Sequence, residues 1–490
     1  MKENKSIKIN AILNVIRSCL SVIFPLITYP YVMRVIGATG LGKVSYVSSI
    51  VGYFSLLAML GVSSYAVREG ANIKRKTKQF KQFVSEVFTI NFIFTIFAYI
   101  LLFIVVLSIK NLHNYEPLFV ILGASIIFQT FSVDWVNTIF EDYLYITIRS
   151  IILYLLNACI MFLWIKSEED YIKYAVLQVL PSGIICVLNW IYCRKYVKIS
   201  LTRNPNFRKH LKPLVILFVN SLMVSIYVNF DTTMLGWLKG DYYVGLYTAA
   251  VKVYGVVKGI LIAIYAVVIP RLALFYGEKK IDQFRNLYTK LWCYLSLLLI
   301  PMGIGLACLS KEIILIMGGK TYVNATPSLQ VLAVALVFAI FGGLLTTCLN
   351  VTIGREKENL KATIISAVIN GGLNFVFIPI WGHTGAALTT LISELFVLVY
   401  SIIKLPNITL YLETNNVLRN LRQVIIGSTG IIIWAILIKQ WTIEIIPRII
   451  LTVLGASLIY ILALMILRNE YVIELIKKRK RNKDRNRIKD

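Results

Sequence analysis

The chain has 490 residues, 58% of which are hydrophobic, and its formal net charge is +27. Soluble globular proteins average about 45–50% apolar residues, so this excess excludes an ordinary soluble domain. The apolar residues form long blocks between short charged loops. Lysine and arginine at the cytoplasmic ends of membrane helices therefore explain the basic charge better than nucleic-acid binding does.

A membrane-spanning helix needs about 20 apolar residues. Fourteen such blocks fit the chain, with almost nothing left for a soluble domain. They cover residues 10–35, 43–66, 83–109, 117–140, 147–165, 172–193, 214–238, 243–269, 291–309, 327–352, 362–380, 384–403, 423–438 and 449–467. The charged residues 1–10 lead into a long first block, which we expect to be an uncleaved helix and not a signal peptide. The sequence predicts an all-α polytopic membrane protein with about 14 transmembrane helices.

Lysine and arginine are divided unevenly between the two sides that this map defines. If the N-terminus is cytoplasmic, the cytoplasmic segments hold 37 of them, the outside loops seven, and the spans or their edges the remaining seven. Cytoplasmic loops carry an excess of basic residues, so both termini are expected in the cytoplasm. We expect the basic tail, residues 468–490, to be attracted to anionic lipid headgroups.

The spans are organised as six plus six plus two. Gly40-Leu41 before the second span and Gly245-Leu246 at the start of the eighth form a faint internal echo. Two six-helix lobes of the same orientation would bind substrate between them near the membrane midplane. We expect an N-terminal six-helix lobe (1–193), a basic cytoplasmic linker (194–213), a C-terminal six-helix lobe (214–403), two additional helices (404–467) and a basic cytoplasmic tail (468–490).

The first span carries a polar stripe on one helical face. Its members follow one another at steps of three or four residues, namely Asn10, Asn14, Arg17, Ser21, Pro25 and Thr28. A charge at the centre of a membrane helix costs roughly 2.5–3.5 kcal/mol, so such a residue usually faces a cavity. We expect Arg17, Asn14 and Ser21 to line a substrate cavity. The alternative is a structural arginine that pairs with another helix or reaches the interface.

Further cations lie in the fifth and eighth spans. Lys258 shares a helical face with Tyr254, and Lys252 lies on a different face of the same span. An ammonium beside tyrosine suits a sugar phosphate, because the ammonium binds phosphate oxygens and the ring can pack on a sugar. Arg149 begins the fifth span. All four are candidate substrate-binding residues, and the alternative for Lys258 and Arg149 is an anchor at the membrane edge.

Two intramembrane carboxylates, Asp231 and Glu394, are candidate sites for a coupling ion, H⁺ or Na⁺, because a buried carboxylate can titrate or hold a cation. The alternative is a salt bridge to one of the intramembrane cations. Seven cysteines without a CxxC motif and only three histidines argue against a metal site, and we expect no cofactor. The sequence also lacks a nucleophile–His–acid set, so we do not expect an enzyme.

Four stretches carry a resemblance to a known family. They are FPLITYPYVMRVIGATGLGKVSYVSSIVGYFSLLAMLGVSSYAVREGA (24–71), FSVDWVNTIFEDYLYITIRS (131–150), NFDTTMLGWLKGDYYVGLYTAAVKV (229–253) and NGGLNFVFIPIWGHTGAALTTLISE (370–394). In these segments the chain resembles the bacterial oligosaccharide flippases, the O-antigen and capsule repeat-unit translocases of the multidrug/oligosaccharidyl-lipid/polysaccharide exporter superfamily. The resemblance implies fourteen helices in two six-helix lobes plus two, and a switch between inward-facing and outward-facing states.

The resemblance also implies a cargo, an undecaprenyl-diphosphate-linked oligosaccharide, and a location in the bacterial inner membrane. Membrane lipids, a polysaccharide polymerase and chain-length proteins are the expected partners, with no nucleic acid. Three transport alternatives stay open at this point: a multidrug or cation antiporter of the same superfamily, a lipid II-type flippase, and a flippase for another undecaprenyl cargo. A membrane polysaccharide polymerase or glycosyltransferase would need a large external loop, which the sequence lacks. A non-transporting scaffold is disfavoured by the polar stripe of the first span.

Overall fold

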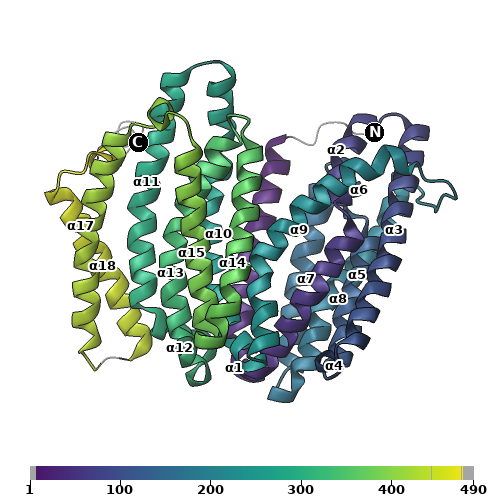
Figure 1. Ribbon diagram of the computed structural model, residues 1–490, viewed down its shortest axis with the longest axis horizontal. Helices are drawn as coiled ribbons and strands as arrows, with labels where there is room; N and C mark the ends of the chain where they lie inside the picture. Colours follow the sequence, from purple (N-terminus) through teal and green to yellow (C-terminus); the bar gives the residue numbers. More distant parts are fainter. Residues whose placement is uncertain (1–6, 443, 476, 478–490) are drawn as a thin grey trace, which may run out of the picture. The chain divides into compact units, whose positions relative to one another are not determined.

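The computed structural model describes residues 7–442, 444–475 and 477, and the side chains of residues 7–23 and 266 lie outside the description. These residues form helices and contain no strand (Figure 1). By their internal contacts they fall into two compact units, Met1–Thr248 and Ala249–Asp490. These units are defined by contacts, whereas the two predicted six-helix lobes, 1–193 and 214–403, are defined by a sequence repeat. The division into lobes stays a prediction.

The first unit is built around α1, which packs against α3, α5, α7 and α9, while α5 packs against α8. The unit ends within the first turns of α10. Its helices are α1 (Ile7–Met59), α2 (Val62–Ile73), α3 (Thr77–Ser108), α4 (Lys110–His113), α5 (Glu116–Ser132), α6 (Asp134–Ile139), α7 (Tyr143–Trp164), α8 (Tyr171–Tyr192), α9 (Phe207–Leu238) and α10 (Asp241–Gly277), with short 3₁₀ turns η1 (Glu168–Asp170) and η2 (Cys193–Lys195).

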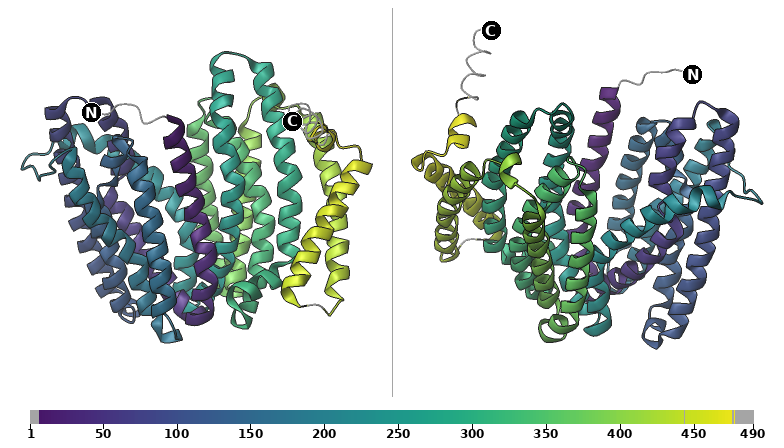
Figure 2. Two further views of the ribbon diagram at one scale, coloured as in Figure 1. Left: turned by 180° about the vertical axis from the view of Figure 1, so that it is seen from behind. Right: turned by 45° about the horizontal axis from the view of Figure 1, so that its top comes forward.

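The second unit begins inside α10. Helix α15 packs against α13 and α14, and α11 packs against α13 and α17, with α18 beside α17 (Figure 2). Its further elements are α11 (Ile281–Cys308), α12 (Ser310–Gly318), η3 (Lys320–Ala325), α13 (Thr326–Gly343), the π-helical turn η4 (Leu344–Asn350), α14 (Glu356–Trp381), α15 (His383–Lys404), α16 (Ile408–Tyr411), α17 (Thr414–Lys439) and α18 (Ile445–Ile466).

Thirteen helical stretches in the described part of the chain are long and apolar enough to cross a membrane. The first of them, Phe24–Ile73, includes most of α1, which Gly37 breaks with a φ of 67° that a residue with a side chain rarely adopts. That break separates the first two predicted spans, so the prediction of about 14 transmembrane helices is confirmed. Helices are the expected elements here, because backbone groups in hydrocarbon must be hydrogen-bonded within their own segment.

Many large apolar side chains point outward. Val267, Leu163 and Ile466 are 78%, 76% and 81% exposed. A water-soluble protein rarely exposes large contiguous apolar surface, whereas a membrane helix presents it to lipid. The interior, in contrast, holds many polar side chains, and these carry the contacts described below.

A buried histidine ties the start of α9 to α2 and α3. His210 is fully buried, and its Nε2 lies 2.8 Å from Oε2 of Glu86. The hydroxyl of Tyr65 lies 2.7 Å from Nδ1 of the same ring. Gln82 donates to the other oxygen of Glu86 at 2.9 Å. Both ring nitrogens and both carboxylate oxygens are therefore satisfied, which removes most of the cost of burying them.

The second half of α1 and the start of α10 meet at their backbones. A Cβ atom on Gly42 would collide with the carbonyl group of Asp241, and one on Gly245 would collide with the carbonyl group of Ala38. Glycine is therefore required at both positions by the closeness of the two helices, a form of packing that membrane proteins use widely.

Gly42→Ala should destabilise the chain by about 1–3 kcal/mol, since the methyl group would force the two backbones apart. Gly52→Ala is the matched control, because a Cβ at Gly52, also in α1, would meet nothing within 4 Å. The measurement is the melting temperature of both purified variants in detergent. Equal melting temperatures for Gly42→Ala and Gly52→Ala would contradict the close approach.

Candidate functional site

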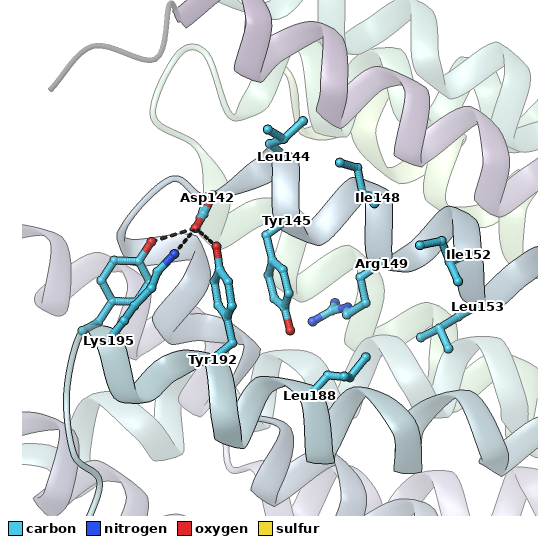
Figure 3. A pocket seen from close by; sticks show the side chains of 11 residues that line it. Asp142, Leu144, Tyr145, Ile148, Arg149, Ile152, Leu153, Leu188, Tyr192 and Lys195 are labelled. Carbon is cyan, nitrogen blue, oxygen red and sulfur yellow. Dashed lines mark hydrogen bonds and ion pairs between the residues drawn. The ribbon is translucent and has the colours of Figure 1, made fainter. Parts of the chain in front are cut away.

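Arg149 is held by a buried polar network in the first unit. It lies near the start of α7 and is 5% exposed. Its Nη1 is 3.1 Å from Oδ1 of Asp134, the first residue of α6, and the same nitrogen donates to Oδ1 of Asn189 in α8. The guanidinium carbon is 5.4 Å from the ring centroid of Tyr145 (Figure 3). The charge of Arg149 is thus compensated inside the protein, as burial requires.

Asn189 joins four helices at this place. Its Oδ1 also accepts hydrogen bonds from Nδ2 of Asn137 and from the hydroxyl of Tyr145, each at 3.1 Å. Its Nδ2 donates to Asp134 Oδ1 at 3.0 Å and to the Ser132 carbonyl oxygen at 2.8 Å. The network therefore bridges α5, α6, α7 and α8. An anionic ligand of the guanidinium would have to compete with the carboxylate of Asp134.

Lys258, Tyr254 and Glu394 form one charge centre in the second unit. Nζ of Lys258 donates to Oε1 of Glu394 at 2.8 Å and to the hydroxyl oxygen of Tyr254 at 3.0 Å. The Tyr254 hydroxyl lies 3.4 Å from the same carboxylate oxygen, and its ring centroid lies 5.2 Å from the ammonium. The lysine and carboxylate side chains are 26% and 8% exposed. The lysine side chain is thus the more exposed member of this ion pair.

Polar bonds between α14 and α15 support the side of this centre that holds Glu394. Ser366 Oγ donates to the carbonyl oxygen of Ser393, the residue before Glu394, at 3.1 Å. Further along, Thr389 Oγ1 donates to Asn374 Oδ1 at 2.6 Å. Because these side chains are buried, the bonds hold α15 in register on α14.

Asp231 lies in the first unit, in α9, and is 3% exposed. Its Oδ2 accepts a hydrogen bond of 2.6 Å from the hydroxyl of Tyr247, in the part of α10 that belongs to the same unit. Two residues further, Thr233 lies 2.8 Å from the Ser49 hydroxyl of α1 and 3.3 Å from that of Tyr53. The Tyr247 hydroxyl is thus one partner of Asp231, and Thr233 joins α9 to α1.

The other candidates are placed less completely. Lys252 is exposed on α10. The backbones of Asn14, Arg17 and Ser21 belong to α1, but their side chains lie outside the described residues, so the cavity role of that stripe stays a prediction. Lys258, Tyr254 and Glu394 are brought together, whereas Arg149 and Asp231 each belong to a network of their own.

Sequence reasoning missed Asn189 and Asp142 as partners of the cationic residues. Asn189 is a lone polar residue near the end of α8, and Asp142 is the residue before α7; both are weak signals. Asn189 is 40 residues from Arg149, and Asp142 is 53 residues from its partner Lys195. Helical periodicity predicts neighbours three or four residues apart on one helix, so it does not predict pairs of this kind.

Comparison with known proteins places the chain among membrane exporters. The profile of a family described as "Polysaccharide biosynthesis protein" matches residues 7–275, and one described as "MatE" matches residues 217–379. A protein of Shigella dysenteriae named "Putative O-antigen transporter" is 22% identical over 381 residues, which cover 77% of this chain and 94% of that protein.

Solved structures share the fold. "Lipid II flippase MurJ, inward closed conformation" matches with a TM-score of 0.74 at 15% identity, over 95% of this chain and 99% of that one. An inward-facing multidrug resistance MATE family transporter of the MOP superfamily matches with a TM-score of 0.60 at 16% identity, over 80% of this chain and 96% of that one. At such identities the likeness concerns the fold.

Arg149→Ala should lower the stability of the folded chain by about 1.5–3 kcal/mol, because it removes charge-assisted hydrogen bonds to Asp134 and Asn189. The exposed Arg194→Ala is the control, since it removes the same charge without a buried partner. Thermal unfolding of both purified proteins in detergent checks the difference. If both variants unfold at the wild-type temperature, the network does not stabilise the α5–α8 bundle.

Proposed function

Because the chain belongs to the polysaccharide biosynthesis protein family, we propose that it is a flippase that moves undecaprenyl-diphosphate-linked oligosaccharide units from the cytoplasmic to the outer leaflet of a bacterial inner membrane. The chain is a polytopic membrane transporter of the flippase type. An oligosaccharide cargo is supported by the O-antigen transporter named above, which aligns over 94% of its own length.

The observation that carries the mechanism is the Lys258–Glu394–Tyr254 centre. An ammonium has three N–H donors, so Lys258 can keep its bond to Tyr254 while it exchanges Glu394 for a phosphate oxygen. The ring of Tyr254 offers a flat face to a sugar. Binding of an anionic cargo by Lys258 would release the carboxylate of Glu394, which could then take up H⁺ or Na⁺.

This exchange provides a route to coupling. A carboxylate inside a membrane needs either a cation or a proton, so displacement from Lys258 makes cation binding at Glu394 more favourable. Asp231, held by the Tyr247 hydroxyl, is the second carboxylate that could serve in this way.

Two other transport functions remain as alternatives. A lipid II-type flippase shares this fold, and its cargo would present the same diphosphate to Lys258. A multidrug or cation antiporter is favoured by the match to the MatE family. It would need an acidic site for cationic drugs, whereas the carboxylate of Glu394 is compensated by a lysine.

We expect a polymerase and chain-length proteins to act after the flippase.

Replacing the charges should separate cargo binding from folding. In a strain without the gene, Lys258→Ala should reduce surface polysaccharide by about tenfold or more while lipid-linked units accumulate inside, since a charge-assisted contact of about 1.5–3 kcal/mol is lost. Arg17→Ala and Lys252→Ala test the other predicted cavity cations, and the exposed Lys239→Ala is the control. All variants are compared at matched membrane expression.

The exchanged pair Lys258→Glu with Glu394→Lys distinguishes a structural pair from a ligand site. The exchanged pair should reach the membrane at the wild-type level but not export, because the cation then projects from α15 in place of α10. Full export by the exchanged pair would contradict cargo binding by Lys258. Unchanged polysaccharide with increased sensitivity to cationic drugs in the deletion strain would favour the antiporter.

The predicted orientation is tested separately. With both termini in the cytoplasm, a reporter that is active only in the cytoplasm should be active when fused after Asp490, and a reporter that needs export should be inactive there. Fusions after Lys439 should give the reverse pattern. The same pattern at both positions would contradict an odd number of crossings between them.

A further inference from the structure

A pocket of about 510 Å³ lies between α7 and the end of α8 in the first unit (Figure 3). Three of its lining residues, Leu144, Ile148 and Ile152, follow one another at steps of four on α7, and they are 43%, 48% and 58% exposed. Leu188 of α8 lines the pocket too and is 40% exposed. Exposed apolar side chains on a membrane helix face acyl chains, so this part of the pocket is open to lipid.

The other end of the pocket is polar and aromatic. Oδ2 of Asp142 accepts hydrogen bonds from the hydroxyls of Tyr192 and Tyr196 at 2.6 and 2.7 Å, and from Nζ of Lys195 at 2.9 Å. Figure 3 shows Lys195 and Tyr192 converging on Asp142. The rings of Tyr145 and Tyr192 are stacked, with centroids 3.6 Å apart and planes at 4°. The pocket therefore has one lipid-facing wall and one rigid aromatic wall.

Lys195 is fixed in place but can still bind a ligand. Its ammonium lies 3.7 Å from the ring centroid of Tyr192 and 4.5 Å from that of Tyr196, which limits the positions it can adopt. Its side chain is 44% exposed. Burial and the nearby Asp142 carboxylate raise the pKa of Tyr196 to about 12, so this tyrosine stays a hydrogen-bond donor at neutral pH.

The surroundings of the polar end are basic. Arg194, the residue before Lys195 in the chain, is exposed. Arg149, which also lines the pocket, has an Nε with no hydrogen-bond partner in the part of the chain that the structure describes. Tyrosine and long basic side chains gather where a membrane helix meets the headgroup layer. The basic side chains at one end of the pocket and the lipid-facing wall at the other suit an anion that is attached to an acyl chain.

We propose that this pocket binds the phosphate headgroup of a membrane lipid. Lys195 would contact the phosphate oxygens, the Tyr145–Tyr192 stack would form the wall beside the headgroup, and the first carbons of the chain would lie along Leu144, Ile148 and Ile152. The phosphate could belong to an acidic phospholipid or to a polyprenyl phosphate, since both present the same chemistry. The site goes beyond the proposed cargo centre at Lys258, because it shares no residue with it.

The test is lipid binding by the purified full-length chain in a neutral detergent, followed by native mass spectrometry. The probes are dioleoyl-phosphatidylglycerol, undecaprenyl phosphate and, as the chain without phosphate, dioleoylglycerol. Lys195→Gln should weaken binding of the phosphate lipids by about tenfold, the value of one charge-assisted contact. Binding of dioleoylglycerol should be weak and unchanged.

Lys198→Gln is the matched control, because it removes the same charge three residues away without lining this pocket. Lys195→Arg should retain binding. Folding should survive Lys195→Gln, since Asp142 keeps two tyrosine donors, and the melting temperature of each variant verifies this. Preference of the wild type for one of the two phosphate lipids identifies the source of the headgroup.

Equal losses in Lys195→Gln and Lys198→Gln would overturn the proposal, because they would indicate general attraction to a basic surface. Dioleoylglycerol binding as strong as that of the phosphate lipids would overturn it too. Neither result would contradict the flippase proposal, because that proposal is tested by export in cells. The lipid-site proposal and the flippase proposal can therefore fail separately.

Discussion

A charge inside a membrane has to find its counter-charge within the protein, because the hydrocarbon around it offers neither water nor polar groups. Arg149 with Asp134 and Lys258 with Glu394 both follow this constraint. Each pair joins different helices, so the same contacts that neutralise the charges also determine which helix faces meet. The polar interior and the apolar exterior of the chain both follow from the hydrocarbon that surrounds it.

The two pairs differ in what surrounds them. Arg149 shares its partners with Asn189, which is fully buried and hydrogen-bonded on both ends of its amide, so the arrangement has little freedom to change. Lys258 has a simpler environment, one carboxylate and one hydroxyl, and it is the more exposed member of its pair. A simple pair is easier to exchange for a ligand than a closed network. This difference makes Lys258 a better candidate for cargo binding than Arg149.

The membrane edge is a third environment. Near the ends of α7 and α8, Asp142 gathers Lys195 and two tyrosines, while apolar residues one and two turns further along α7 are exposed. Here a charged side chain can meet water, a headgroup or an aromatic ring, so it does not need complete compensation inside the protein. The arrangement allows a lipid to be recognised by its headgroup without any part of it entering the helix bundle.

The sequence by itself determined the membrane class, the approximate number of spans and the family resemblance. Hydropathy and helix length are local properties, so the break at Gly37 between the first two spans and the start of α15 after Gly382 could both be predicted from short segments. Only the tertiary structure decided the partners, because they lie far apart in the chain: Glu394 is 136 residues from Lys258, and Asp142 is 53 from Lys195. Which helix faces meet depends on packing between helices, and no local pattern contains that information.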